Sequence, residues 1–500
     1  MTRVSLDVLQ SKTRDDRIWC VCRGCNFVLW WVWGGDVFLL HGGIFISIKI
    51  INYLIIGGGM KFKISIFSLF FILCFSLSVK AKMLNLNGFV LDNGLKVVVA
   101  QNKKAPVIMH KLYYKVGSVD DPIYKGGVAH LLEHLMFRGT KNVKDREFNY
   151  LTEINGADNN AYTTYSHTGY YEFSDISKLE LMMALEADRM ENLEINDEAF
   201  YKERDVVLEE RMQRYETNPS IKFYETLNRV FWEKHPYGRS VGGEIEEIKG
   251  LEKKDVLDFY NKYYKPSNAI LVMVGDISVD EAKILANKYY GKIKGENIKD
   301  KESDDVLLKS DKINIDMALS GITAPRFVSY WHLKNGEFSD KEILALKVVS
   351  EFLTGDDTAY LYDKLVYQDK SFLSVGVDVS YDEKLGGIVS FYGVPADLSM
   401  KLDDFKKIMS ENIKVAMDNF EENKLQEIKN ESLSNTIYML ENPQSIASFV
   451  GAMLIDGKSV EEIENYDEFI KSVSFDDVRG VWDKLVNNDK REIYGMIKPN

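Results

Sequence analysis

The apolar residues of this chain alternate between strand-like and helix-like spacing from about residue 86 onward. Two short apolar runs, 88–91 and 95–100, flank Asp92-Asn93-Gly94, a turn signal that predicts a hairpin of two strands. Residues 107–116 predict a further strand. Apolar residues then recur at helical spacing from Val128 to Phe137, directly after two glycines. This alternation indicates an α/β or α+β fold.

A similar order of elements recurs in the second half of the chain. The helical segments of the first half are 178–194, 197–215 and 253–264, and an apolar strand follows at 269–274. A charged tract, 292–312, is poor in large apolar residues and predicts a solvated linker. Strands and a helix are then expected at 313–322, 327–333 and 341–353. We therefore expect two similar domains, 82–295 and 313–500, joined by a linker at 296–312.

The segment that starts at Met60 has the pattern of a secretory signal peptide, residues 60–81. A basic start, an apolar run from Ile64 to Leu77 and a small-residue cleavage pattern follow one another. A permanent anchor is the alternative, but the run is shorter than the roughly 20 residues that a spanning helix needs. We expect cleavage before Lys82, export to the bacterial periplasm and no stable membrane anchor. Residues 1–59 are interpreted as an upstream extension outside the working protein.

Charge and cysteine content narrow the classes of partner and site. Of the 63 Lys+Arg and 76 Asp+Glu residues, 9 and 4 lie in residues 1–81, so the exported chain has a net charge of −18. Such an acidic chain disfavours nucleic acid as a partner. All four cysteines precede Lys82, so the exported chain cannot form disulfides. Their C-x-C-x-x-C cluster lacks the second ligand pair of a zinc site.

The candidate chemistry lies in the segment His130-Leu131-Leu132-Glu133-His134. Histidines at positions i and i+4 of a helix project from one face and can hold one metal ion. Glu133 lies beside them and can reach a metal-bound water without being a ligand. This order is the inverse of H-E-x-x-H and is typical of inverzincins, which use zinc. The alternative is that His130 and His134 are ordinary, partly buried helix residues.

A catalytic zinc ion usually takes three protein ligands and one water, so a third ligand must come from elsewhere in the chain. The segment 203–210 offers Glu203 and Glu210, which are seven residues apart and share a helix face, whereas Glu209 points away. We expect Glu210 to be the third ligand. Glu203 is expected to orient a zinc-bound histidine and so to assist catalysis.

These residues resemble the pitrilysin/insulinase metallopeptidases, which include short bacterial members and the mitochondrial processing peptidases. The resemblance covers most of residues 86–280, and its second half is fainter. Segment 127–140 matches the family signature, and Glu203 and Glu210 fall where its second glutamate helix belongs. Further matches are Asn160-Ala161-Tyr162-Thr163, His235-Pro236-Tyr237-Gly238-Arg239, Pro266-Ser267-Asn268 and Val274-Gly275-Asp276.

The resemblance implies two mainly antiparallel sheets, each packed with helices, that together form a clam-like chamber for peptides or unfolded segments. It also implies that Asn160 and Ala161 lie on an exposed edge strand that pairs with the substrate backbone. The family's second domain usually contributes an arginine and, seven residues later, a tyrosine. Val366 and Leu373 occupy those positions here, so part of the complete site is absent. His110, His167 and His235 are interpreted as structural.

The residues and the resemblance together predict a zinc metalloendopeptidase with one Zn²⁺ per chain. The missing arginine and tyrosine predict that this chain is the zinc-bearing member of a pair. Its partner would be a sister subunit with the Arg/Tyr pair, or a second copy of the chain. The alternative is a non-catalytic assembly or scaffold subunit of the same fold.

Overall fold

The computed structural model describes residues 84–296, 308–382 and 385–500, together with four short strands nearer the N-terminus. These strands are β1 (Ile18–Cys20), β2 (Trp30–Trp33), β3 (Asp36–His41) and β4 (Ile44–Lys49). They form one antiparallel sheet within a first compact unit, Met1–Lys80. The expected signal peptide and most of the expected linker lie outside the described residues. The second unit is Ala81–Asn500.

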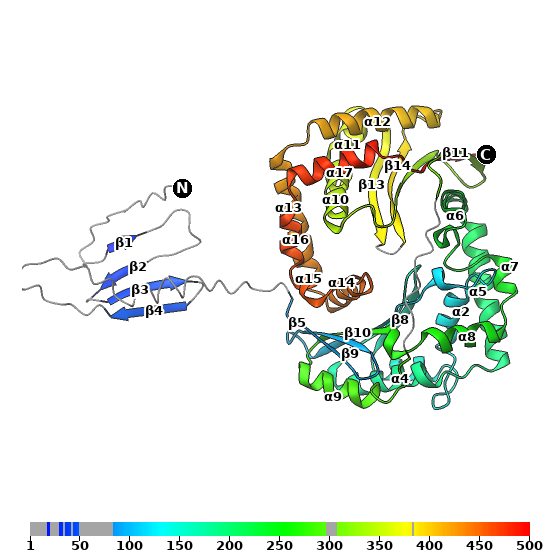
Figure 1. Cartoon of the computed structure of the whole chain (residues 1–500), viewed down its shortest axis with the longest axis vertical. Coiled ribbons are helices and arrows are strands. Elements are labelled where there is room, and N and C mark those ends of the chain that lie inside the picture. Colours follow the sequence, from blue (N-terminus) through cyan, green and yellow to red (C-terminus); the bar gives the residue numbers. More distant parts are fainter. Residues whose placement is uncertain are drawn as a thin grey trace, which may run out of the picture. The chain divides into compact units, whose positions relative to one another are not determined.

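A six-stranded sheet organises the first half of this second unit, with the strand order β5-β6-β10-β7-β9-β8 (Figure 1). All neighbouring strands are antiparallel except β6 and β10, which are parallel. The strands are β5 (Leu86–Val90), β6 (Lys96–Gln101), β7 (Val107–Tyr114), β8 (Asp158–Thr163), β9 (Thr168–Asp175) and β10 (Ala269–Gly275). The predicted hairpin is confirmed as β5 and β6, and Gly94 takes the positive φ of its turn.

Helices of the first half cover one face of this sheet. The helices of this half are α2 (Val128–Leu135), α3 (Glu147–Ile154), α4 (Leu179–Asn192), α5 (Asp197–Thr217), α6 (Pro219–Trp232), α7 (Ile245–Lys249), α8 (Lys253–Tyr263) and α9 (Val279–Tyr289). Helix α6 differs from the others because it packs on the second sheet. In β6, Val97 and Val99 pack into the core beneath these helices, whereas Val98 packs into a separate core on the other face. A central strand that is apolar on both sides requires cover on both faces.

The second half repeats the topology of the first, as the sequence predicted. Its five-stranded sheet has the order β11-β15-β12-β14-β13, and again only one pair, β11 and β15, is parallel. The strands are β11 (Lys312–Leu319), β12 (Arg326–Leu333), β13 (Phe372–Asp382), β14 (Gly386–Pro395) and β15 (Glu492–Pro499). The helices are α10 (Asp340–Thr354), α11 (Tyr360–Tyr362), α12 (Leu402–Asp418), α13 (Glu422–Met439), α14 (Pro443–Ile455), α15 (Val460–Glu464), α16 (Tyr466–Ser472) and α17 (Phe475–Asn487).

The two halves exchange one helix each. Helix α14 of the second half packs on the first sheet against β10 and β7, in a core with Val98 and Tyr113 (Figure 1). Helix α6 of the first half packs on the second sheet, where Phe223 and Leu227 contact a core formed with β12 and β15. The two sheets are thus each covered by helices of their own half on one face and by a helix of the other half on the opposite face.

Glycines allow both exchanged helices to approach their sheets closely. A Cβ atom at Gly451 of α14 would lie 2.2 Å from the ring of Tyr113 on β7. The hydroxyl of Tyr113 donates a hydrogen bond of 2.9 Å to the carbonyl of Ala447 in the same helix. At the other contact, a Cβ atom at Gly495 of β15 would lie 2.8 Å from Leu227 of α6.

Gly451→Ala is expected to destabilise the protein although alanine is the better helix former. The added methyl group overpacks a buried contact, which typically costs about 1–3 kcal/mol. Gly480→Ala in α17 is the matched control, because a Cβ atom there meets nothing within 4 Å. The control is expected to gain up to about 1 kcal/mol from helix propensity. Urea unfolding of both variants measures the difference, and equal free energies of unfolding would contradict the close approach.

A cluster of aromatic rings lies where α6 meets the second sheet. The Trp232 ring centroid is 4.8 Å from that of His235 and 5.3 Å from that of His332 on β12. Burial lowers the pKa of both histidines from 6.5 to about 4, and the charge of His235 adds to the effect on His332. The Nδ1 atom of His332 is buried and has no hydrogen-bond partner among the described residues.

The lowered pKa values predict that this contact weakens in acid. Between pH 6.5 and 4 the folded state binds fewer protons than the unfolded state, so stability is lost as the pH falls through this window. His332→Phe removes one such group and is expected to reduce that loss by on the order of 1–3 kcal/mol. Denaturant unfolding at pH 7 and pH 4.5 measures the loss, and an unchanged pH dependence would refute the assignment.

Candidate metal centre

Helix α2, which carries the H-x-x-E-H segment, begins at a tightly packed turn. Gly127 is its N-cap and has a φ of 89°. A Cβ atom at this position would lie 2.6 Å from the carbonyl oxygen of Gly242, so no other residue fits without strain. The carboxylate of Asp121 accepts hydrogen bonds from the backbone N–H groups of Gly127, at 2.7 Å, and of Ala129, at 3.0 Å. A buried carboxyl group therefore fixes the start of the helix, and burial raises its pKa to about 7 although these two hydrogen bonds oppose the shift.

The three expected metal ligands converge between α2 and α5. The ring centroids of His130 and His134 are 4.9 Å apart, and the rings lie at 78° to each other. From α5, Glu210 places its Oε2 atom 3.7 Å from Nε2 of His134. One donor atom from each of the three residues lies within 4.8 Å of the others.

Glu203 lies on the same face of α5 as Glu210, two turns nearer the start of the helix, as its spacing predicted. Its Oε2 atom is 3.8 Å from Nδ1 of His134, on the side of the ring opposite to Glu210, and it also pairs with Arg138. Burial alone would raise the pKa of Glu203, but His134 and Arg138 lower it to about 2. Burial alone would lower the pKa of His134, yet the three neighbouring glutamates raise it. Glu203 is therefore an ionised carboxylate beside the His134 ring.

Glu133 takes a different direction from the two histidines. Its Oε2 atom accepts a hydrogen bond of 2.5 Å from the hydroxyl of Thr163 on β8. Burial raises the pKa of Glu133 above its usual value, and the hydrogen bond from Thr163 partly opposes this shift. The carboxylate is thus more basic than an exposed glutamate and is tethered to a strand at the edge of the sheet.

The donor set fits a zinc ion. Two imidazoles and one carboxylate are the ligands of many catalytic zinc sites, which leave a fourth position open for water. Burial lowers the pKa of His130 to about 4, so its ring is neutral at pH 7, as metal binding requires. Its Nδ1 atom is buried and has no hydrogen-bond partner among the residues that the structure describes.

Several neighbours of this centre did not emerge from the sequence. Thr163 reaches α2 only through the tertiary fold, although it lies in a segment that matches the family. Asp121 lies six residues before Gly127, and it was not singled out from the sequence. Arg214 had a local sequence signal, because it lies four residues after Glu210 on the same helix. Arg138 follows the end of α2, within the segment 127–140 that matches the family signature. The guanidinium of Arg214 is 2.7 Å from the Oε1 atom of Glu210.

The remaining histidines have structural surroundings, as expected. His110 is buried in the core and its ring nitrogens bond to Glu172, at 2.7 Å, and to the hydroxyl of Tyr290, at 3.0 Å. His167 contacts the hydroxyl of Thr164 in the turn between β8 and β9, at 3.0 Å.

Two family profiles match consecutive parts of the chain. The profile described as insulinase (peptidase family M16) matches residues 96–244, and the profile of the M16 inactive domain matches residues 250–432. The first match contains the whole candidate metal centre. The chain belongs to the insulinase family. The resemblance inferred from the sequence is thereby confirmed.

The names of the chain's relatives describe different functions. The chain is 30% identical over 288 residues to the zinc protease PqqE of Helicobacter pylori, covering 55% of this chain and 62% of that protein. It is 32% identical over 201 residues to a probable mitochondrial-processing peptidase subunit beta of Schizosaccharomyces pombe, covering 40% of this chain and 44% of that protein. It is 30% identical over 205 residues to cytochrome b-c1 complex subunit 1 of Bos taurus, covering 41% of this chain and 42% of that protein. The chain thus spans less than two thirds of each relative.

Two solved protease structures share the fold of this chain. A protease from Helicobacter pylori has a TM-score of 0.72 at 23% identity, covering 83% of this chain and 100% of that one. The first half of the periplasmic protease PqqL from Escherichia coli has a TM-score of 0.69 at 18% identity, covering 83% and 92%. The expected architecture, two similar sheets each packed with helices, is confirmed.

The second half of this insulinase-family chain holds the positions where an arginine and a tyrosine were expected. Val366 is partly buried and packs against the core of the second half. Leu373 lies on β13, at the edge of the second sheet, and is 60% exposed. Neither side chain can donate a hydrogen bond to a substrate.

Among the described residues, no helix has the length and apolar character that crossing a membrane requires.

Asp121→Ala is expected to destabilise the start of α2 in this insulinase-family protein and so to lower the free energy of unfolding. The substitution leaves two buried backbone N–H groups without an acceptor, which costs about 1–3 kcal/mol. Asp258→Ala is the control, because that carboxylate is 63% exposed and pairs only with Lys254 on the surface. Chemical unfolding compares the two free energies of unfolding. Equal losses in both variants would show that Asp121 does not anchor the helix.

Proposed function

We propose that this chain is a zinc metalloendopeptidase that hydrolyses peptides or unfolded polypeptide segments. The observation that carries the proposal is the convergence of His130, His134 and Glu210 beside the half-buried carboxylate of Glu133. Membership of the insulinase family and the similarity to a zinc protease support it. In this proposal residues 82–295 form the catalytic domain, 313–500 form a second domain without metal, and 296–312 link them.

Each residue of the centre has a distinct part in the proposed reaction. A bound zinc ion would supply Lewis acidity that activates water and polarises the scissile carbonyl. Glu133 accepts the proton of the attacking water at its carboxylate and delivers it to the leaving amine. Its raised pKa suits both transfers. Glu203 holds the His134 ring in one orientation, so that the opposite nitrogen faces the metal position.

The substrate backbone would be held by strand addition. Asn160 and Ala161 lie on β8, which ends the first sheet and has no neighbour on its outer side in the described fold. An extended peptide can add to such an edge through backbone hydrogen bonds, with little dependence on its sequence. Thr163, which bonds Glu133, lies on the same strand. A peptide on β8 would therefore run past the proton acceptor.

A partner is part of the proposal because Val366 and Leu373 supply no polar group. A sister subunit with an arginine and a tyrosine, or a second copy of the chain, would complete the oxyanion site. Subunit architecture is common among the relatives, whose names include a processing-peptidase subunit beta and a cytochrome b-c1 complex subunit. No nucleic acid is expected as a partner, since the exported chain is acidic.

Export is proposed from the leader and from one relative. The segment 60–81 has the composition of a signal peptide, and PqqL of Escherichia coli, which shares the fold, is described as periplasmic. We therefore place the working chain, from Lys82, in the bacterial periplasm without a stable membrane anchor.

The second candidate function is that of a non-catalytic assembly subunit. The apolar residues at positions 366 and 373 favour it, as does the similarity to a subunit of the cytochrome b-c1 complex. Against it stands the complete set of His130, Glu133, His134, Glu203 and Glu210. An assembly role requires none of these residues, and it predicts that their replacement leaves the function unchanged.

Glu133→Gln and His134→Ala should separate proton transfer from metal binding. Glu133→Gln is expected to retain one zinc per chain and to lose hydrolysis by at least about 10²–10⁴-fold, because its amide cannot accept the proton. His134→Ala is expected to lose the metal itself. The measurements are zinc content by elemental analysis and cleavage of quenched fluorescent peptides by residues 82–500, with and without chelator.

The control is Glu209→Gln, which lies next to Glu210 on α5 but is exposed, and which should retain full activity. Equal activity of Glu133→Gln and the parent chain would refute the proposed mechanism. A parent chain that binds one zinc ion but cleaves nothing would indicate a missing partner or an assembly subunit.

A further inference from the structure

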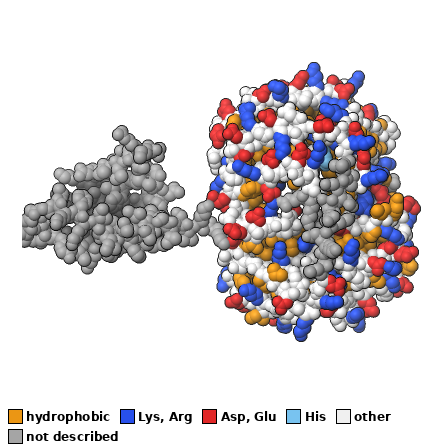
Figure 2. All heavy atoms as spheres, viewed as in Figure 1, with side chains coloured by type: hydrophobic (Ala, Val, Ile, Leu, Met, Phe, Trp, Pro, Cys, Tyr) orange, Lys and Arg blue, Asp and Glu red, His pale blue; other side chains and the backbone are white. Residues whose placement is uncertain are grey.

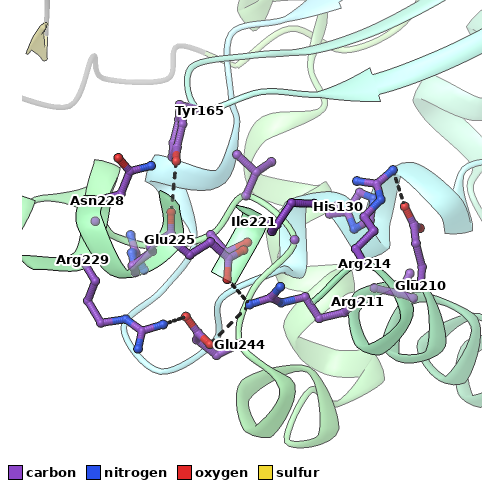
Figure 3. Close-up of a pocket in the computed structure, with 16 residues that line it drawn as sticks. His130, Tyr165, Glu210, Arg211, Arg214, Ile221, Glu225, Asn228, Arg229 and Glu244 are labelled. Atoms are coloured by element: carbon purple, nitrogen blue, oxygen red, sulfur yellow. Dashed lines mark hydrogen bonds and ion pairs between the residues drawn. The ribbon is translucent and has the colours of Figure 1, made fainter. Parts of the chain in front are cut away.

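A pocket of about 260 Å³ opens beside the candidate metal centre. Its walls come from α5, α6 and the segment 238–244, and both His130 and Glu210 line it (Figure 3). Ligand and cofactor pockets usually measure about 300–1,000 Å³. This smaller pocket therefore suits a single side chain, and it lies next to the position of the scissile bond in the proposed reaction.

Charged side chains dominate the lining of the pocket. Its carboxylates are Glu210, Glu225 and Glu244, and its guanidinium groups are Arg211, Arg214, Arg229 and Arg239. Each carboxylate has an arginine 2.7 Å away, as Figure 3 shows in part; the pairs are Arg214 with Glu210, Arg211 with Glu225 and Arg229 with Glu244. One arginine therefore remains without a carboxylate.

The surplus cation is Arg239. In the described residues its guanidinium donates only to backbone carbonyls, those of Asp121 at 3.1 Å and Val119 at 3.4 Å, and its charge partly opposes the rise in the pKa of the nearby Asp121 carboxyl group. Within the described part of the chain, no carboxylate oxygen lies within ion-pair distance of it. The lining thus has more positive than negative charge, although the exported chain as a whole is acidic. The charges that line the pocket determine its electrostatic potential, because salt screens charges more than about 8 Å away.

Arg214 lies at the mouth of the pocket and is the arginine most available to a ligand. Its side chain is 68% exposed, and its partner Glu210 is an expected metal ligand. A carboxylate that shares its charge with a metal ion attracts a neighbouring guanidinium less strongly. Arg214 therefore has unused hydrogen-bonding capacity toward the pocket, with the planar geometry that binds carboxylates through two parallel bonds.

We propose that this pocket is a specificity subsite for an acidic side chain of the substrate, next to the scissile bond, and that Arg214 binds its carboxylate. The inference rests on the proposed peptidase function and adds a substrate class to it. A glutamate or aspartate side chain supplies the negative charge that the lining lacks. A lysine or arginine side chain would meet two or more unscreened guanidinium groups.

The first test compares peptides that differ only by Glu or Gln at each position flanking the scissile bond. At one position, kcat/KM is expected to be at least about tenfold higher for Glu, the effect of a charge-assisted hydrogen bond. Binding of the same peptides to the Glu133→Gln variant is measured by fluorescence anisotropy, so that recognition is tested without turnover. Equal affinity for the Glu and Gln peptides at every position would overturn the subsite.

The second test uses Arg214→Gln and Arg214→Glu, with Lys202→Glu as the control on an exposed face of the same helix. Arg214→Gln is expected to remove the Glu preference through KM, so that Glu and Gln peptides are cleaved with about equal kcat/KM, while one zinc ion per chain still binds. Arg214→Glu should favour Lys at that position. Loss of zinc in Arg214→Gln would show that this arginine positions Glu210 instead, and would overturn the proposal.

The two tests distinguish failure of the subsite from failure of the proposed function. A chain that cleaves no peptide but binds Glu peptides more tightly, through Arg214, would support the subsite and count against the peptidase. A chain that cleaves Glu and Gln peptides equally well would support the peptidase and overturn the subsite.

Discussion

The burial of α6 on the second sheet is the contact on which the rest of the structure depends. Helix α6 follows α5 after one residue, Asn218, which caps it. Because Phe223 and Leu227 are fixed in a core built by the second half, the end of α5 is fixed as well. Glu203 and Glu210 lie on α5, so the carboxylate side of the metal centre is held by both halves of the chain.

The histidine side of the centre depends on the first half alone. Helix α2 packs in the core beneath the first sheet, and Asp121 holds its N-terminus through two hydrogen bonds. Arg239 donates to the carbonyl of the same Asp121 and also lines the pocket beside the metal centre. The helix start, the metal ligands and the pocket are therefore connected through one short network. The visible surface of this unit otherwise carries interspersed acidic and basic side chains (Figure 2).

What the sequence predicted correctly was encoded over short distances. The hairpin of β5 and β6 follows from its turn residues, and the strands and helices of both halves follow from their apolar spacing. His130, Glu133 and His134 were predictable because one helical turn brings them together, and Glu203 with Glu210 because two turns do. The contact of Thr163 with Glu133 joins residues 30 positions apart that only the fold brings together. The exchange of α6 and α14 was equally inaccessible, since an apolar helix face does not specify which sheet covers it.

That exchange changes how the two halves should be regarded. They share a strand topology, and each contributes a helix to the other at equivalent places in the chain, α6 after α5 and α14 after α13. Two half-length chains that traded the same helix would form a domain-swapped dimer with this arrangement. The single chain can thus be described as such a dimer whose two subunits have been joined end to end. Only one of them carries the proposed metal ligands.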